Sequence, residues 1–486
     1  MVVNYKAVIG LEIHAELKTD SKLFCGCSTS FGSEPNTHCC PVCLGFPGAL
    51  PVLNQRAMEL ALVAAMSLDC EIASSNRFDR KNYFYPDLPK AYQISQYDQP
   101  VARNGKLSVP GSQSDNEKAI RINRVHIEEE AGKLLHPGGD IFESDYSLVD
   151  YNRSGIPLIE IVTEPDIESA EEAKLFLEEL RLILLYGEIS DCRMEEGSLR
   201  CDANVSVMPP GSREMGEKVE VKNMNSFRAV ELALEYEINR QSQLLDREEK
   251  VVQETRHWNE EKKTTQSLRS KEEASDYRYF PEPDLPPVHV EDAWLQNLKK
   301  ELPEAPAKKR ERFNSVYGLD YKDIEIMISS PSLAAFYEEA ACHTSDYVNL
   351  ANWVVGEFLR IVHDEEKSVE EMDPLLLVKT LNMLQEGKIN RSVAKEILPE
   401  VLVHGKEPGE IVESRGLSRI ADPEYLEEIV DKVISANPQA VNSYVGGKKK
   451  AFGFLVGKVM EETRGRAEPG VVNKLLEEKL QEVGQT

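Results

Sequence analysis

The sequence has no long hydrophobic run, since no stretch approaches the roughly 20 apolar residues that a membrane-spanning helix needs. The N-terminal MVVNYKAVIG leads directly into a strand pattern, with neither a signal nor a transit peptide. An apolar fraction of 41% and a charged fraction of 29% are typical of a soluble globular protein. We therefore predict a cytoplasmic protein with no membrane partner.

Basic residues are scarce: 57 Lys and Arg stand against 84 Asp and Glu, which gives a net charge of −27. Non-specific nucleic-acid binding depends on many phosphate contacts from Lys and Arg, so this composition argues against a general nucleic-acid coat protein. The helix–turn–helix-like junction at 385–395 has no basic recognition helix after it. We predict helix packing at this junction and no DNA partner.

Several nucleotide and hydrolase motifs are also absent. The segment GGKKK at 446–450 lacks the frame of a Walker A loop, and the chain has neither a dinucleotide-binding fingerprint nor a G-x-S-x-G nucleophile elbow. If the chain uses ATP, carboxylates and Mg²⁺ must therefore bind the phosphates in place of a P-loop.

Cysteine is concentrated in one place, with five of the nine residues between positions 25 and 43. An odd total without a secretory signal argues against a disulfide framework. Two close pairs separated by a loop are typical of a structural zinc knuckle, and the alternative is a set of reduced, buried thiols. His38 and Cys39 are spare ligands, so spacing alone does not fix the set. The paired candidates are Cys25, Cys27, Cys40 and Cys43.

Strand patterns dominate the first 290 residues and mix with a few long helical patterns. An amphipathic helix is predicted at 169–189, where Ser169 is the N-cap and Glu172 completes a capping box. A second helix begins after Asn225 or Ser226. Because no regular βαβ rhythm appears, we predict an α+β domain around an antiparallel sheet. The main strand patterns lie at 10–19, 119–134, 147–167, 198–207 and 218–227.

Beyond a proline-rich segment at 275–290 nearly every pattern is helical. A chain of 486 residues exceeds what one hydrophobic core usually serves. We therefore predict three parts: an α+β domain at 1–294, an all-helical domain at 295–409 and a helical tail domain at 410–486.

The tail reverses the charge of the chain, because six basic and two acidic residues between positions 441 and 466 give a local net charge of +4. This is the obvious place to meet a phosphate backbone, and a solvated helix end is the alternative. The basic residues are Lys448, Lys449, Lys450, Lys458, Arg464 and Arg466.

One strand, GLEIHAELKT at 10–19, alternates apolar side chains with Glu12, His14 and Glu16. Two other strand patterns are also polar on one face, in the run His126 to Glu130 and around Asp202. Carboxylate oxygens with an imidazole suit Mg²⁺, which takes a few protein ligands plus phosphate. Spacing alone does not show that the strands meet, and a solvated sheet face is the alternative interpretation.

A series of motifs in this order resembles the B subunits of tRNA-dependent Asp/Glu amidotransferases, the GatB/GatE family. It continues in the segment from NPQAVNSYVGGKKK onward, which resembles the YqeY-like tail of that family. The resemblance implies that residues 1–294 form a catalytic cradle domain and that 410–486 form the YqeY-like domain. The N-terminal motifs are GLEIHAELKT, CPVCLGFPGALPVLN, RKNYFYPDLPKAYQISQ, RVHIEEEAGK, DYNRSGIPLIEIVTEPD, EGSLRCDANVSV, EVKNMNSFRAVELALEYE and DYRYFPEPDLPPV.

The resemblance implies a heterotrimer in which this B-type chain joins an amidase, the A subunit, and a small C subunit. The amidase would release ammonia from glutamine, and the ammonia would travel through an internal channel to the B-type chain. There ATP would phosphorylate the side-chain carboxylate of mischarged Glu-tRNA(Gln) or Asp-tRNA(Asn), and ammonia would displace the phosphate. The implied activity is that of a carbon–nitrogen ligase with glutamine as amido donor, acting in protein biosynthesis.

The resemblance also implies roles for individual residues. The cysteine pairs would bind zinc, although the adjacent Cys39 leaves the identity of the fourth ligand open. The basic tail would bind the tRNA body. For the basic residues assigned to the kinase site, the alternative interpretation is that they form ordinary surface ion pairs. The implied residues are Glu12, His14 and Glu128 or Glu129 for Mg²⁺ and catalysis, Lys81 for catalysis, and Arg80, Lys90 and Asp202 for ATP or the aminoacyl end.

Two other functions fit parts of the sequence. A zinc-containing RNA-binding scaffold would explain the knuckle and the tail without chemistry, and ATP turnover stimulated by mischarged tRNA would exclude it. A free-standing metal hydrolase acting on small amides would leave the basic tail without a role.

Overall fold

The computed structural model describes residues 5–110, 117–137, 144–212, 214–270, 276–420, 423–446, 448, 450–463 and 465–485. The chain divides into two compact units, Met1–Pro306 and Ala307–Thr486. The division into three domains stays a prediction.

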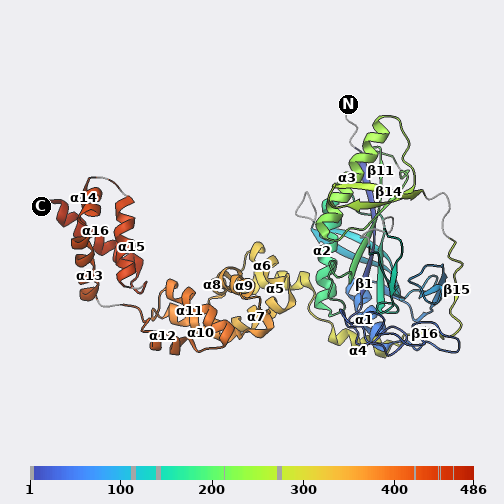
Figure 1. The fold of residues 1–486 in the computed structure, drawn as a ribbon, viewed down its shortest axis with the longest axis horizontal. Coiled ribbons are helices and arrows are strands. Elements are labelled where there is room, and N and C mark those ends of the chain that lie inside the picture. Colours follow the sequence, from blue (N-terminus) through green and yellow to red (C-terminus); the bar gives the residue numbers. More distant parts are fainter. Residues whose placement is uncertain are drawn as a thin grey trace. The chain divides into compact units, whose positions relative to one another are not determined.

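The first unit is built on a nine-stranded sheet with the order β14-β13-β12-β11-β1-β10-β7-β6-β2. Figure 1 labels β1, β11 and β14 of this sheet. Its neighbouring strands pair antiparallel except β12 and β13, which are parallel. The predicted α+β class is confirmed, with one parallel pair in an otherwise antiparallel sheet. The strands are β1 (Lys6–Glu16), β2 (Glu71–Ile72), β6 (Ala102–Pro110), β7 (Glu117–Glu129), β10 (Pro157–Thr163), β11 (Leu199–Met208), β12 (Val219–Lys222), β13 (Glu254–Asn259) and β14 (Thr264–Ser270).

Helices α1 (Gln55–Ser67), α2 (Ala170–Tyr186) and α3 (Phe227–Asp246) pack on the sheet. The alternating apolar residues of β1, among them Leu11 and Ile13, are buried in the core that these helices share with the strands. Alternation therefore leaves the other face of β1 for its polar side chains.

Both predicted N-caps are present. The side chain of Ser169 accepts a hydrogen bond from the backbone N–H of Glu172 at the start of α2, and Ser226 caps α3. The capping box is wrong in one detail, because the Glu172 carboxylate accepts the N–H of Glu168 instead of that of Ser169. Lys118 of β7 also binds this carboxylate, at 2.8 Å, and holds it there.

Smaller sheets complete the first unit. A three-stranded sheet of β15 (Phe280–Pro281), β4 (Asp79–Asn82) and β5 (Tyr92–Ser95) fastens the segment around residue 280 to the aromatic stretch near residue 80. Helix α4 (Asp292–Glu301) packs on α1. The remaining pairs are β16 (Val288–His289) with β3 (Ser75–Asn76) and β8 (Lys133–Leu135) with β9 (Leu148–Asp150).

The described part of the second unit is helical, as predicted. Helices α13 to α16 share a core of their own around Val430, Leu455 and Leu476. The junction at 385–395 joins two packed helices, and Asn390 caps the second one. The helices are α5 (Pro306–Tyr317), α6 (Tyr321–Ile328), α7 (Pro331–Ala341), α8 (Tyr347–Trp353), α9 (Leu359–Asp364), α10 (Pro374–Gln385), α11 (Arg391–His404), α12 (Pro408–Arg415), α13 (Pro423–Ala436), α14 (Pro438–Val445), α15 (Lys450–Glu462) and α16 (Pro469–Gln485), with a π-turn at Val354–Phe358 and a 3₁₀ turn at Val369–Glu371.

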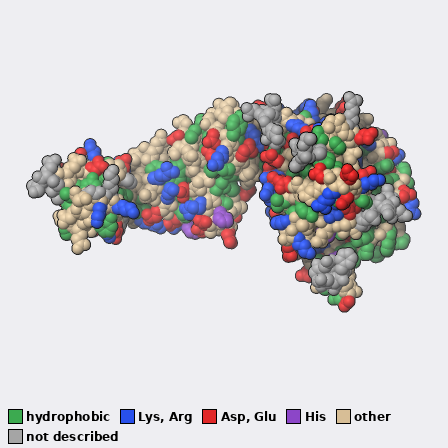
Figure 2. All heavy atoms as spheres, turned by 90° about the horizontal axis from the view of Figure 1, so that it is seen from above, with side chains coloured by type: hydrophobic (Ala, Val, Ile, Leu, Met, Phe, Trp, Pro, Cys, Tyr) green, Lys and Arg blue, Asp and Glu red, His purple; other side chains and the backbone are tan. Residues whose placement is uncertain are grey.

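Acidic and basic side chains are interspersed on the molecular face shown in Figure 2. Among the described residues, no helix is long and apolar enough to cross a membrane.

Candidate metal and phosphate site

Four neighbouring strands place a row of polar residues on one face of the sheet. In the register of the strands, His14 of β1 lies opposite Arg200 of β11 on one side and Glu160 of β10 on the other. Glu160 in turn lies opposite His126 of β7. Residues directly opposite in neighbouring strands project from the same face, so this register brings two imidazoles to one carboxylate.

This row forms the floor of a cavity of about 700 Å³. Its walls come from the three-stranded sheet, from the segment containing Tyr277 and Tyr279, and from β12 with the residues that follow it. The predicted polar strands therefore do meet, and β10 lies between two of them. The charged and histidine side chains of the lining are Glu12, His14, Lys81, Arg124, His126, Glu128, Glu130, Glu160, Arg200, Asp202, Glu220 and Lys222.

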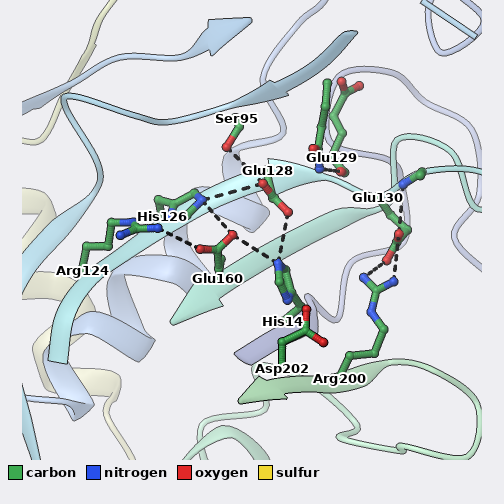
Figure 3. A network of polar contacts seen from close by, with 12 residues as sticks. His14, Ser95, Arg124, His126, Glu128, Glu129, Glu130, Glu160, Arg200 and Asp202 are labelled. Atoms are coloured by element: carbon green, nitrogen blue, oxygen red, sulfur yellow. Dashed lines mark hydrogen bonds and ion pairs between the residues drawn. The ribbon is translucent and has the colours of Figure 1, made fainter. Parts of the chain in front are cut away.

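The centre of the cavity holds two imidazoles and two carboxylates in mutual contact (Figure 3). The Nε2 atom of His14 lies 3.1 Å from Glu160 Oε2 and 3.5 Å from Glu128 Oε1. The Nε2 atom of His126 lies 3.4 Å from Glu160 Oε2 and 3.7 Å from Glu128 Oε2. Two overlapping donor groups, Glu12–His14–Glu160 and His126–Glu128–Glu160, each have ligand atoms within 4.8 Å of one another, as a metal ion requires.

The electrostatics of this cluster favour charged forms. Burial lowers the pKa of His14, but its hydrogen bonds to Glu128 and Glu160 outweigh burial and raise that pKa to about 10. The same balance raises the pKa of His126 to about 8. The two imidazoles and the carboxylates of Glu128 and Glu160 therefore stabilise one another's charged forms. Glu12 is the exception, because burial and the charge of Glu160 raise its pKa and so favour its neutral form.

The sequence left open whether Glu128 or Glu129 faces the site. Alternation along β7 puts Glu128 on the floor of the cavity, where the Ser95 hydroxyl donates to it at 3.1 Å. Glu129 projects from the other face and binds the Lys90 ammonium at 2.6 Å. Neither Glu129 nor Lys90 lines the cavity, so the geometry favours Glu128 as the donor.

Of the three predicted cations near residue 80, Lys81 is the one that lines the cavity. Its ammonium lies 5.1 Å from the centre of the Tyr277 ring, and no carboxylate within the described residues forms a salt bridge with it. Burial lowers the pKa of Lys81, but the charge of Glu128 raises it further, so the ammonium stays protonated. Arg80 instead binds Glu282 through two hydrogen bonds of 2.7 and 2.9 Å.

Asp202 lies in the cavity, opposite Glu12 in the register, and forms an ion pair with Lys222 of β12. Arg124 donates to the second oxygen of Glu160 at 3.1 Å. The cavity therefore contains cations as well as carboxylates, which suits a ligand with several negative charges.

Sequence reasoning missed Glu160 and did not select His126. Glu160 lies in PLIEIVT, which has the pattern of an apolar strand. Ile159 and Ile161, on either side of Glu160, are both fully buried. A single carboxylate between two core residues must lie on the opposite face, and that was the available signal.

The knuckle at 25–43 forms a second donor group. The Sγ atoms of Cys25, Cys27, Cys40 and Cys43 lie within 4.8 Å of one another, and Cys39 is not part of the group. Four thiols at this spacing fit a tetrahedral zinc ion. A hydrogen bond from the Cys25 thiol lowers the pKa of Cys43 to about 4.

Lys22 lies beside this group with 1% of its surface exposed. Its ammonium donates to the carbonyl oxygens of His38 at 2.8 Å and Tyr151 at 3.1 Å, and it lies 3.8 Å from Cys43 Sγ. No carboxylate among the described residues pairs with it. The positive charge of Lys22 helps to lower the pKa of Cys43.

The predicted tRNA contacts of the tail differ in their surroundings. Lys448 and Lys450 are exposed, whereas Lys449 and Arg464 lie outside the described residues. Lys458 pairs with Glu461 at 2.7 Å. Arg466 donates to the backbone oxygen of Gly416 at 2.9 Å, so part of its charge serves the fold.

Comparison with known proteins gives one consistent result. The GatB/GatE catalytic domain matches residues 7–296, and the GatB domain matches residues 335–480. The B subunit of the Aspartyl/glutamyl-tRNA(Asn/Gln) amidotransferase of Carboxydothermus hydrogenoformans is 54% identical over 98% of this chain and 99% of its own length. The protein of the same name from Thermodesulfovibrio yellowstonii is 50% identical over 99% of this chain and 100% of its own length. The chain therefore belongs to the GatB/GatE family.

Proposed function

We propose that this chain is the B subunit of a cytoplasmic glutamine-dependent amidotransferase, a carbon–nitrogen ligase acting on mischarged Glu-tRNA(Gln), Asp-tRNA(Asn) or both. The observation that carries the proposal is the cavity in which His14, Glu128 and Glu160 meet and which Lys81 also lines. Relatives of near-identical length bear this name, which supports the substrate class.

The reaction has two steps. An oxygen of the side-chain carboxylate attacks the γ-phosphorus of ATP, the bond to the β-phosphate oxygen breaks, and ADP leaves with the electron pair. Ammonia then attacks the acyl carbon, phosphate leaves, and the nitrogen loses a proton to give the amide. A carboxylate is a poor electrophile, so the phosphoryl group is needed as a leaving group.

The donor set fits Mg²⁺, because carboxylate oxygens with an imidazole are ligands that a hard divalent cation accepts. Glu12, His14, Glu128 and Glu160 would hold it, and it would neutralise charge on the transferred phosphoryl group. Lys81 binds the γ-phosphoryl oxygens, since its ammonium is charged and free of a carboxylate salt bridge in the described chain. Arg80 and Lys90 act indirectly, by holding Glu282 and Glu129.

The other parts of the chain have supporting roles in this proposal. The thiol knuckle holds a structural zinc ion, because four protein ligands leave no open position for a substrate. The amidase and the small C-type partner supply the ammonia, and the exposed lysines of the tail contact the tRNA body. An enclosed route keeps ammonia away from bulk water, where it would be protonated.

The test is ATP-dependent amidation by the chain combined with its amidase and small partner, with Glu-tRNA(Gln) or Asp-tRNA(Asn) as substrate. We expect turnover that needs Mg²⁺ and mischarged tRNA, and a loss of more than about 100-fold in Glu12→Gln and His14→Ala with tRNA binding retained. The control is His257→Ala, which removes an imidazole from the same sheet outside the cavity.

Normal turnover in both cavity variants would show that the polar face of β1 is not the kinase site. Binding of tRNA without any ATP turnover by the wild-type complex would favour the RNA-binding scaffold instead.

A further inference from the structure

We infer that Tyr97 and Tyr279 form a stacking platform, at the mouth of the cavity, for the terminal adenine of the aminoacyl-tRNA. The platform holds the last nucleotide where the side-chain carboxylate of its amino acid reaches the charged cluster. Neither tyrosine is among the residues to which the family resemblance gives a role. The inference deepens the proposed function and rests on it for the identity of the ligand.

Tyr97 stands where the cavity opens to solvent. It lines the cavity, yet 59% of its surface is exposed. It comes shortly after β5, and its backbone N–H donates to the Asp79 carboxylate of β4 at 3.0 Å. Asp79 is itself buried, with 2% of its surface exposed. The three-stranded sheet therefore holds the backbone of Tyr97 in place, while much of the side chain remains open to a ligand.

The ring of Tyr97 is already stacked on one side. Its centre lies 4.2 Å from the centre of the Tyr279 ring, and the two ring planes differ by 10°. Tyr279 also lines the cavity and is partly buried. A stacked pair with an exposed ring accepts a further flat ring, and an unpaired base stacks on tyrosine without any particular hydrogen-bond pattern. The pair is therefore preorganised for a nucleobase.

Tyr279 connects this pair to the charged centre of the cavity. Burial raises the pKa of its phenol to about 12, and the charges of Lys81 and Glu128 act on that pKa in opposite directions, which requires them to be close. Its ring meets the edge of Tyr277, with ring centres 6.0 Å apart, and the Lys81 ammonium lies 5.1 Å from the Tyr277 ring centre. A base stacked on Tyr97 therefore lies at one end of an aromatic row whose other end is Lys81.

The chemistry of the substrate identifies the base. The amino acid of a mischarged tRNA is esterified to the ribose of the terminal adenosine, so that base must stay within the reach of one side chain from the cluster. The tRNA body is too large to enter a cavity of about 700 Å³. The terminal base therefore has to be held at the opening, where Tyr97 lies. ATP also carries an adenine, but the whole nucleotide is small enough to pass inside.

The test is the fluorescence of 2-aminopurine, placed as the terminal base of tRNA(Gln) or tRNA(Asn) and titrated with the complete complex. Stacking quenches this base, so we expect quenching by the wild-type complex. Tyr97→Ala should lose most of the quenching and raise the KM for the mischarged tRNA about 10-fold, the effect of losing one base–aromatic stack, with the KM for ATP unchanged.

Two further variants show whether the ring itself is responsible. Tyr97→Phe keeps the ring and should restore the quenching that Tyr97→Ala loses. Tyr146→Ala is the matched control, because it removes a tyrosine of similar exposure, 62%, from the first unit outside the cavity. It should quench as the wild type does.

The inference is overturned by equal quenching in wild type and Tyr97→Ala, or by a KM that rises for ATP and not for tRNA, since the platform would then hold the adenine of ATP. Amidation by the complete complex, measured in parallel, separates the two proposals. Normal amidation with equal quenching removes the platform and leaves the function. Quenching that depends on Tyr97 without any amidation removes the function and leaves a binding site for a terminal adenine.

Discussion

The two candidate metal sites of the first unit are assembled in opposite ways. The thiol knuckle takes its donors from one loop, Cys25 to Cys43, whereas the cavity takes its donors from three strands between Glu12 and Glu160. Ligand spacing along the chain therefore identifies the first site. The second exists only because the sheet places β10 between β1 and β7.

The two sites also differ in the kind of donor atoms that they offer to a metal ion. The knuckle offers four soft sulfur donors beside one buried ammonium, and four protein ligands leave a tetrahedral ion no open position for a substrate. The cavity offers hard donors around about 700 Å³ of space, with several cations in its walls. A closed donor set is typical of structural metal sites, and an open one is typical of catalytic sites.

The largest effect is expected from removing the carboxylate that joins the two donor groups of the cavity. Glu160→Gln keeps the shape of the side chain but removes the charge, so we expect amidation to fall by more than about 100-fold. The control is Glu164→Gln, which lies just beyond β10 and outside the cavity. Equal activity in the two variants would remove Glu160 from the catalytic site. The measurement is kcat/KM for ATP in the complete complex.

Two partly buried lysines, Lys81 and Lys90, provide a sharper comparison within the same region. Lys81→Met should lower kcat by about 100-fold with little change in the melting temperature, because its ammonium forms no salt bridge within the described residues. Lys90→Met should instead destabilise the chain by roughly 3–5 kcal/mol, because it leaves the buried Glu129 carboxylate unpaired.

Thermal unfolding followed by circular dichroism and single-turnover ATP cleavage separate these two lysine effects. The assignment would be reversed if Lys90→Met kept its stability while losing turnover.

The smallest effect is expected beside the knuckle. Lys22→Met removes the buried ammonium near Cys43, so we expect zinc affinity to fall about 10- to 100-fold while Mn²⁺ binding in the cavity is unchanged. Zinc transfer to a chromophoric chelator measures the change, and Lys18→Met, an exposed lysine in the same segment, is the control. Unchanged zinc affinity would show that the thiolates need no charge compensation from this lysine.

Much of the first unit could be predicted from local patterns. The alternating burial around Ile13 and the two N-caps, Ser169 and Ser226, could each be predicted from a few neighbouring residues. Strand periodicity and helix capping depend only on such local sequence. The predicted hydrogen bond from the backbone N–H of Ser169 to the Glu172 carboxylate does not form. That carboxylate instead binds Lys118, which is distant in sequence.

The sequence by itself determined the α+β class, the helical second half, the presence of a cysteine knuckle and the family, since each depends on residues close together or on whole motifs. The structure was needed to leave Cys39 out of the thiol group. Only the tertiary structure decided that Glu160 and His126 join His14, that Glu128 and not Glu129 lines the cavity, and that Arg80 and Lys90 are already paired. The physical reason is that strand order and register set these contacts, and neither is encoded in the spacing of the residues that meet.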